Sequence, residues 1–284
     1  MGGFDWRPLR SVDRSQLNEA RLQAHYAVQW LARAARAFVS PRPDDSHTNL
    51  SWIDAFDGFT TQRLKDDLGL GLRIADLTLV RMGEGTVRGQ SYPLNERSDM
   101  NARNWLGEQL GAKGLDASTL DAPPPYKIPT HAIANGAAYD ATRPAHALAE
   151  LAAWFSNAHH SLEGIRRQVI GRKLAASPVR CWPHHFDIAT LISVDERKAK
   201  KVRTVNVGLS PGDEHYDEPY FYVSPYPYPD AATLPPLSKL GHWHTREFTA
   251  AIAPSNRIVQ AKDQKVETEA FLLNAIEGAI KTLN

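Results

Sequence analysis

The chain has 284 residues, 42% of them hydrophobic, so it is long enough to bury a core without a partner. Its 33 Lys and Arg residues nearly balance its 32 Asp and Glu residues, which excludes the global positive charge that gathers nucleic acid or anionic lipid. A single cysteine, Cys181, excludes an internal disulfide, and no run of about 18 apolar residues could cross a membrane. We therefore expect a cytoplasmic protein without a nucleic-acid or membrane partner.

The first half of the sequence predicts a long helix, several strands and a shorter helix. Apolar residues recur at three- and four-residue intervals over residues 15–39, which is typical of a helix with one buried face, and Ser15 is the expected cap. Strand-like stretches follow at 50–56, 59–63, 70–82 and 87–94. Ser98 or Asp99 then caps the shorter helix.

The second half repeats this order after a proline-rich connector at residues 121–141. Prolines remove backbone donors, so the start of the connector suits neither a helix nor a central strand. Thr142 is the expected cap of a second long helix, and a closing helix begins at about Asp263. Between them, strand-like stretches lie at 181–194, 202–209, 220–228 and 247–253.

This arrangement predicts an α+β fold of antiparallel sheets flanked by helices, because strands joined by short turns pair antiparallel. The division is residues 1–120 as the N-terminal half, 121–141 as the connector and 142–284 as the C-terminal half with the candidate site. Both halves have the same order of elements, so a structural repeat is one alternative, although the halves share no motif. We expect one composite unit.

The stretch 181–194 supplies the first candidate site residues. Side chains alternate across a strand, so His185 and Asp187 would project side by side from its polar face. Such a pair can ligate a metal ion, or it can act as an acid or base in which the carboxylate orients the imidazole. His184 would lie on the opposite face among aromatic residues, where a hydrogen-bonded core histidine is the usual outcome.

A row of phenols follows in 220–228, where alternation places Tyr220, Tyr222, Tyr226 and Tyr228 on one face. We expect Tyr220 and Tyr222 to line a pocket and bind a cofactor or ligand, because phenols offer stacking area and hydroxyl groups. The alternative is an amphipathic strand at a solvent boundary or a protein interface.

His242 and His244 form a second pair, because in an extended segment the two imidazoles point the same way. A divalent metal ion is the candidate cofactor, with His185, His242 and His244 as its ligands. Further candidates for the third ligand are Asp187, Asp213 and Glu218. The alternative is that both imidazoles bond to backbone groups in a loop.

Carboxylates are clustered at 213–218, and clustering separates their pKa values, so Glu218 is a candidate general acid or base. A solvated turn is the alternative. The nearby Gly208-Leu209-Ser210-Pro211-Gly212 matches the G-x-S-x-G pattern of serine hydrolases. Pro211 stands where that mechanism needs a backbone N–H, so we reject a nucleophilic serine.

Several motifs carry a resemblance to a known family. These are Trp182-Pro183-His184-His185-Phe186-Asp187, Ser210-Pro211-Gly212-Asp213, Glu218-Pro219-Tyr220-Phe221-Tyr222 and Trp243-His244-Thr245 with Phe248. In these stretches the chain resembles a family of bacterial proteins known only as a domain of unknown function. The resemblance implies that the motifs matter, and it implies no reaction or cofactor.

The residues favour a protein that binds a small molecule in a polar and aromatic pocket, with metal-dependent enzymatic activity as an extension. The competing hypothesis is a non-catalytic interaction or scaffold module with an aromatic surface, because Tyr and Trp are enriched at such surfaces. Either hypothesis is compatible with an oligomer.

Overall fold

The computed structural model describes residues 4–83, 86–195 and 202–283, with the backbone alone at 86–89. The chain divides into two compact units. Unit 1 comprises the residues up to Ser11, Ala153–Val179 and Asp187–Asn284, and unit 2 comprises Val12–Ala152 and Arg180–Phe186. Helices account for 40% and strands for 23% of the structure, and the strands form two antiparallel sheets, so the predicted α+β class is confirmed.

Unit 2 contains a five-stranded sheet with two helices. Helix α1 (Arg14–Phe38) confirms the first predicted helix and packs against β3 and α2. The cap is Asp13 rather than Ser15, because the Asp13 carboxylate accepts hydrogen bonds from the first free backbone N–H groups. Helix α2 (Asp99–Gly111) begins after a Ser98 cap, as predicted. The strands, in sheet order, are β1 (Ser51–Ile53), β2 (Gly58–Thr60), β3 (Leu68–Arg73), β4 (Thr78–Gly83) and β5 (Thr86–Pro93).

Two strand predictions in unit 2 were too long. The stretch 70–82 forms two strands, because Leu77 adopts a left-handed backbone conformation with φ 50° in the turn between β3 and β4. Asp54–Phe56 forms a 3₁₀ turn after β1 instead of extending the strand. The proline-rich connector lies in unit 2 and includes the 3₁₀ turn Ala132–Asn135.

Unit 1 contains an antiparallel sheet with strand order β11-β12-β10-β9-β8-β6. The bounds are β6 (Ala175–Ala176), β8 (Asp187–Ser193), β9 (Thr204–Ser210), β10 (Tyr220–Tyr226), β11 (His242–His244) and β12 (Ala250–Pro254). Its helices are the part of α3 (Ala145–Gly171) from Ala153 onward, α4 (Ser255–Val259) and α5 (Gln264–Leu283). Strand β7 (Arg180–Trp182) belongs to unit 2, where Cys181 bridges to Leu50.

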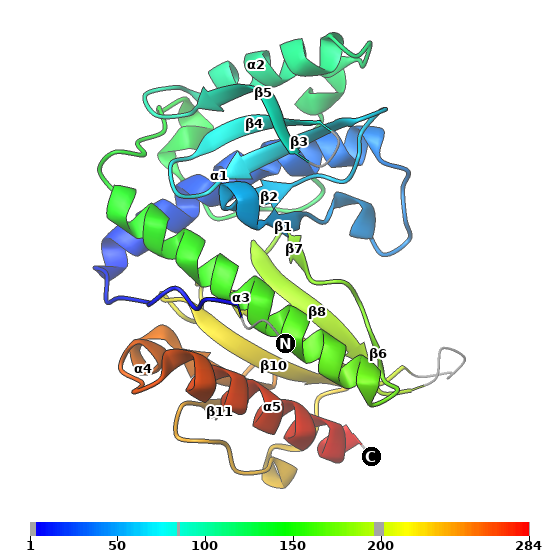
Figure 1. The fold of residues 1–284 in the computed structure, drawn as a ribbon, viewed down its shortest axis with the longest axis vertical. Helices are drawn as coiled ribbons and strands as arrows, with labels where there is room; N and C mark the ends of the chain where they lie inside the picture. Colours follow the sequence, from blue (N-terminus) through cyan, green and yellow to red (C-terminus); the bar gives the residue numbers. More distant parts are fainter. Residues whose placement is uncertain (1–3, 84–85, 196–201, 284) are drawn as a thin grey trace. The chain divides into compact units, whose positions relative to one another are not determined.

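The two faces of the unit 1 sheet differ in chemistry. Phe221 and Val223 of β10 are fully buried on one face, where Phe221 lies 6.4 Å from the ring of Trp154 on α3. Helix α5 packs against β9, β10 and β12, and α3 and α5 cross the sheet in Figure 1. The opposite face carries the alternate residues of each strand and is the polar one. The core therefore lies under the helices, and the chemistry-bearing side chains project from the other side.

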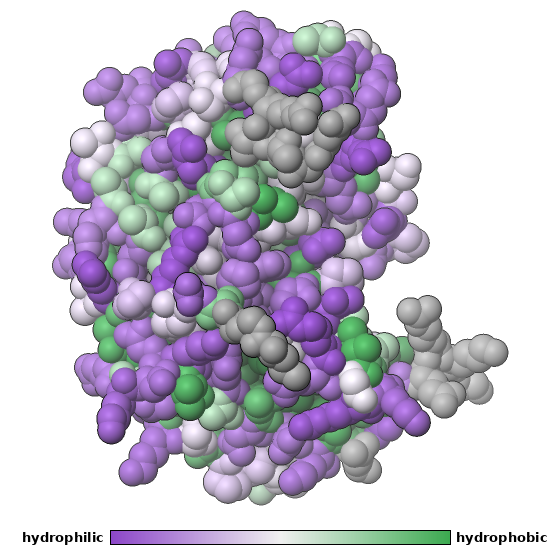
Figure 2. Space-filling model, viewed as in Figure 1, coloured by the Kyte–Doolittle hydropathy of each residue, from purple (hydrophilic) through white to green (hydrophobic). Residues whose placement is uncertain are grey.

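None of the described helices combines the length and apolar character needed to span a bilayer. On the face drawn in Figure 2, hydrophilic side chains predominate and hydrophobic ones form small separate patches.

Candidate functional site

The polar face of the unit 1 sheet brings together residues from five strands. Antiparallel partners share a face, so the pairings of Tyr222 with Ile252 and of Ile252 with His242 place this tyrosine and this histidine on the same face. Alternation adds Tyr220 and His244. The predictions that the two tyrosines share a face and that the two imidazoles share a face are confirmed.

Tyr222 reaches a carboxylate two strands away. Its hydroxyl donates to Asp187 Oδ2 at the start of β8. The ring must cross β9, and it does so at Gly208, where a Cβ atom would lie 2.6 Å from Tyr222 Cζ and Oη. Gly208 therefore provides the space that lets a phenol on β10 meet a carboxylate on β8.

Tyr220 makes the second phenol–carboxylate pair. Its hydroxyl donates to Asp213 Oδ2 in the loop after β9. Burial raises the pKa of both Tyr220 and Tyr222 well above the ordinary value, and the adjacent carboxylates add to this effect. Both phenols therefore keep their hydrogen at neutral pH and act as donors.

The Ser210-Pro211-Gly212-Asp213 motif builds a tight turn that presents Tyr216. Gly212 has a φ of 114°, which L side chains rarely adopt, so glycine is required there. The Asp213 carboxylate accepts the backbone N–H of Tyr216 at 3.0 Å, and Asp213 donates its own backbone N–H to Tyr216 O at 2.8 Å. Ser210 Oγ accepts from Gly212 N at 3.2 Å, which gives this serine a structural role.

The Tyr216 hydroxyl lies between two imidazoles. It is 3.1 Å from His242 Nε2 and 3.0 Å from His244 Nδ1. His244 Nε2 lies 2.5 Å from the carbonyl oxygen of Arg246, which can only accept, so Nε2 carries the ring hydrogen and Nδ1 accepts from Tyr216. The Tyr216 oxygen then accepts from His242 Nε2–H. The hydrogen bonds run in one direction, from His242 through Tyr216 to His244.

Burial lowers the pKa of His242, helped by the positive charge of Arg257 and by His244, so its imidazole is neutral at neutral pH. Burial also raises the pKa of Tyr216, and the charge of Asp213 contributes. His242, Tyr216 and His244 are together called the imidazole–phenol–imidazole cluster. Each of its members is half-buried, so the cluster is open to solvent.

Aromatic and charged side chains surround the cluster. Phe248 stacks on the His244 ring with centroids 4.2 Å apart, and His215 lies 5.7 Å from His244, centroid to centroid. His215 Nε2 lies 3.8 Å from a carboxylate oxygen of Glu214 and 3.7 Å from one of Glu247.

Glu218, predicted as a general acid or base, is buried at the beginning of α4. Its Oε2 accepts from the hydroxyl of Ser255 at 2.5 Å and from the backbone N–H of Asn256 at 2.9 Å. These bonds satisfy donors at the helix N-terminus, so the contacts indicate a structural role.

The expected strand 181–194 is interrupted, which corrects the argument that paired His185 with Asp187. Residues 183–186 form a turn in which Phe186 has a φ of 61°, so strand alternation does not hold across it. His185 is exposed in unit 2, and its ring lies 4.2 Å from that of His184. His184 contacts the rings of Trp182 and Tyr126, as expected for a histidine among aromatic residues.

The predicted metal ligands are only partly brought together. Among the described residues of unit 1, no third His, Cys, Asp or Glu forms a compact set with His242 and His244, so Asp187, Asp213 and Glu218 are not gathered with them. The role of His185 as a ligand stays a prediction. Sequence reasoning missed Tyr216. This tyrosine lies four residues after Gly212, and the sequence alone does not give the backbone conformation of that glycine.

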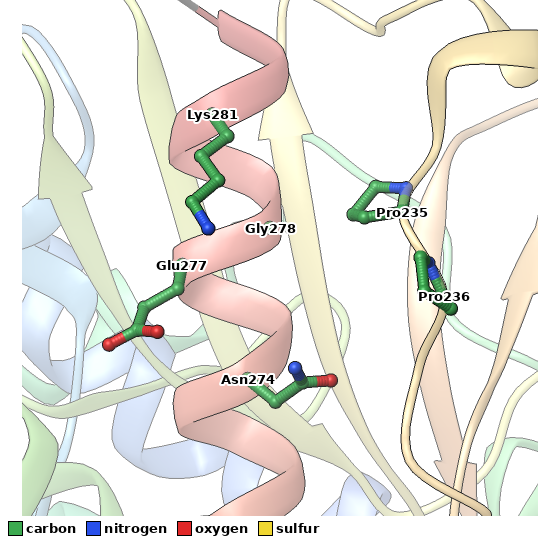
Figure 3. A pocket seen from close by; sticks show the side chains of 6 residues that line it. All are labelled: Pro235, Pro236, Asn274, Glu277, Gly278 and Lys281. Atoms are coloured by element: carbon green, nitrogen blue, oxygen red, sulfur yellow. The ribbon is translucent and has the colours of Figure 1, made fainter.

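Two shallow hollows lie away from the cluster, each of about 230 Å³. One separates α5 from the segment before β11, and in Figure 3 Asn274 points toward the prolines of that segment while Glu277 points away. Its lining residues are Pro235, Pro236, Asn274, Glu277, Gly278 and Lys281. The other hollow, in unit 2, is lined by Ile53, Thr60, Thr61, Arg63, Asp67, Gly69 and Met82. The expected pocket around Tyr220 and Tyr222 is not among these hollows.

Comparisons with family models, with curated proteins and with solved structures gave no match. The resemblance to a bacterial family therefore stays a prediction.

Proposed function

We propose that unit 1 binds a small organic molecule at the imidazole–phenol–imidazole cluster. The observation that supports this proposal is the half-buried Tyr216 hydroxyl, held between His242 Nε2 and His244 Nδ1 at 3.1 and 3.0 Å. A polar group that is aligned by neighbours and still reaches solvent can exchange one of its hydrogen bonds for a bond to a ligand.

The surrounding charges favour a ligand that carries a cation. The cluster is formed by residues 213–218 and 242–248. Among the exposed Asp, Glu, Lys and Arg residues of these two segments, Glu214, Asp217 and Glu247 are acidic and Arg246 is basic. Acidic groups at the mouth of a site attract a positively charged ligand. The rings of Phe248 and Tyr216 add aromatic surface, which attracts organic cations and aromatic rings. The ligand class that fits is an aromatic amine.

Calorimetric titration with tyramine tests this proposal, with acetate as the anionic comparison. The wild-type protein should bind tyramine and not acetate, and Tyr216→Phe should weaken tyramine binding about tenfold, the equivalent of one hydrogen bond. Tyr226→Phe is the matched control, because this tyrosine is 61% exposed at the far end of β10. Equal affinity of Tyr216→Phe and wild type, or no tyramine binding by either, would contradict the proposal.

A second function, a protein interaction surface, is favoured by exposed apolar side chains at one end of the polar face. Tyr226 is 61% and Leu191 is 40% exposed, and strand pairing puts both on that face, because Tyr226 is opposite Thr204 and Leu191 is opposite Asn206. Such side chains suit an interface between two copies of the chain.

Sedimentation equilibrium tests self-association. It should show a wild-type dimer, and the double variant Tyr226→Ser/Leu191→Ser should be a monomer. A wild-type monomer at all concentrations would contradict self-association.

A further inference from the structure

Three potential metal-donor atoms meet in the cluster. They are His242 Nε2, His244 Nδ1 and Tyr216 Oη, with the oxygen 3.1 and 3.0 Å from the two nitrogens. We propose that these three atoms bind a divalent transition-metal ion, and that zinc fits best. The proposal uses the residues of the proposed ligand site, but it holds whether or not an organic amine binds there.

The two oxygen–nitrogen distances agree with tetrahedral coordination. Zinc binds imidazole nitrogen and oxygen at about 2.0–2.2 Å, so two ligand atoms of a tetrahedral site lie about 3.3 Å apart. The observed separations of 3.0 and 3.1 Å are within a few tenths of an ångström of this value. The metal would replace two hydrogen bonds between the same atoms.

His244 already has the environment of a metal ligand. Its Nε2–H donates to the Arg246 carbonyl at 2.5 Å, which leaves the Nδ1 lone pair directed at the cluster. Histidine ligands commonly donate their second ring nitrogen to a backbone carbonyl, and this bond fixes the tautomer and the ring orientation. Phe248 stacks on the same ring with an interplanar angle of 17° and restricts its rotation further.

Tyr216 is held in place from the other side. The turn after Gly212 fixes its backbone through Asp213, and its ring lies 4.9 Å from the Tyr220 ring, centroid to centroid. A zinc ion would form a Zn–O bond as the Tyr216 O–H bond breaks, and the proton would leave to solvent. His242 would bind zinc through Nε2 once its ring hydrogen has moved from Nε2 to Nδ1 by exchange with solvent, which leaves the imidazole neutral. The exposed carboxylates of Glu214 and Glu247 would favour the added positive charge.

The donor set also predicts selectivity. Two imidazole nitrogens and a phenolate oxygen suit zinc, copper or iron, whereas magnesium and calcium prefer sites made of oxygen donors. Three protein ligands leave a fourth position for water or another small group, as in catalytic zinc sites.

Calorimetric titration of the chelator-treated full chain with zinc chloride tests the site. Wild type should bind one zinc ion and release a proton, seen as a binding enthalpy that changes with the ionisation enthalpy of the buffer. His242→Ala/His244→Ala should lose this binding. Tyr216→Phe should weaken it by at least the roughly 10–100-fold that loss of an outer-shell partner costs, and should lower the number of protons released.

His146→Ala is the matched control, because His146 is an exposed histidine on α3 in unit 2 and should leave zinc affinity unchanged. Circular dichroism of each variant establishes that it is folded. Zinc bound with wild-type affinity by the double variant, or equal proton release by Tyr216→Phe and wild type, would overturn the proposal. The tyramine titration on metal-free protein is separate, so failure of one proposal is distinguishable from failure of the other.

Discussion

Tyr222 donates a hydrogen bond to Asp187 across the full width of strand β9, over the backbone of Gly208. The bond joins β10 to the beginning of β8, and these two strands are not neighbours in the sheet. It is a hydrogen bond to a charged group from a phenol that is 8% exposed, so we expect it to contribute more than a typical surface bond.

Tyr222→Phe should lower the free energy of unfolding by about 1–3 kcal/mol, because the Asp187 carboxylate loses a buried donor while the ring is retained. Urea denaturation measures the change, and a double-mutant cycle with Asp187→Asn isolates the pair. Tyr226→Phe, at an exposed tyrosine of the same strand, should change stability by less than about 0.5 kcal/mol. A zero coupling energy between the two positions would show that this bond does not stabilise the fold.

Gly208→Ala should destabilise the protein by about 1–3 kcal/mol. The added Cβ would lie 2.6 Å from the Tyr222 phenol and 2.7 Å from the carbonyl oxygen of Ile188, so the ring would have to leave Asp187. Gly164→Ala is the matched control, since nothing lies within 4 Å of a Cβ at this site on α3, and helix propensity should stabilise it by about 0.5–1 kcal/mol. Thermal unfolding of both variants distinguishes the two outcomes. Equal melting temperatures would contradict the steric argument.

The parts of the fold that follow from side-chain periodicity could be predicted from the sequence. The long helices have apolar stripes that repeat over many turns, and β10 alternates between tyrosines and the buried Phe221 and Val223. Periodicity therefore gave the helices and the polar face of β10 correctly. It also gave the shared face of His242 and His244, because both lie within one strand.

The parts that depend on a single backbone conformation could not be predicted. Phe186 ends the alternation between β7 and β8 with a left-handed conformation, and nothing in its side chain requires this. Gly212 does the same in the turn before Tyr216, where glycine is compatible with several turn types. Helix α4 has five residues, too few to show a period, so the capping contact of Glu218 was hidden.

Glu218→Ala should lower the free energy of unfolding by about 2 kcal/mol, because two donors at the beginning of α4 lose a charged acceptor. Ser255→Ala removes one of the two bonds and should cost about 1 kcal/mol. Chemical denaturation measures both. Glu214→Ala is the control, since Glu214 is exposed in the same acidic segment and should have little effect. If Glu218→Ala and Glu214→Ala are equally stable, Glu218 does not cap α4.

His25 should make the stability of the protein depend on pH below 6.5. Its ring, 3% exposed, stacks on Phe186, and burial lowers its pKa to about 4 against the opposing effect of the Pro183 carbonyl, which accepts from Nε2 at 2.9 Å. The unfolded chain binds a proton near pH 6.5 and the folded chain does not, so the neutral ring contributes stability above pH 6.5 that is lost as the pH falls toward 4. The full loss is roughly 3 kcal/mol.

His25→Gln tests this dependence, because glutamine can still donate to Pro183 and has no group that titrates in this range. Urea denaturation at pH 7.0 and pH 4.5 should show that the variant loses about 2 kcal/mol less stability on acidification than wild type does, whatever its stability at pH 7.0. His146→Gln, at an exposed histidine, should follow wild type. The same loss in His25→Gln and wild type would show that the His25 ring is not held neutral in the folded state.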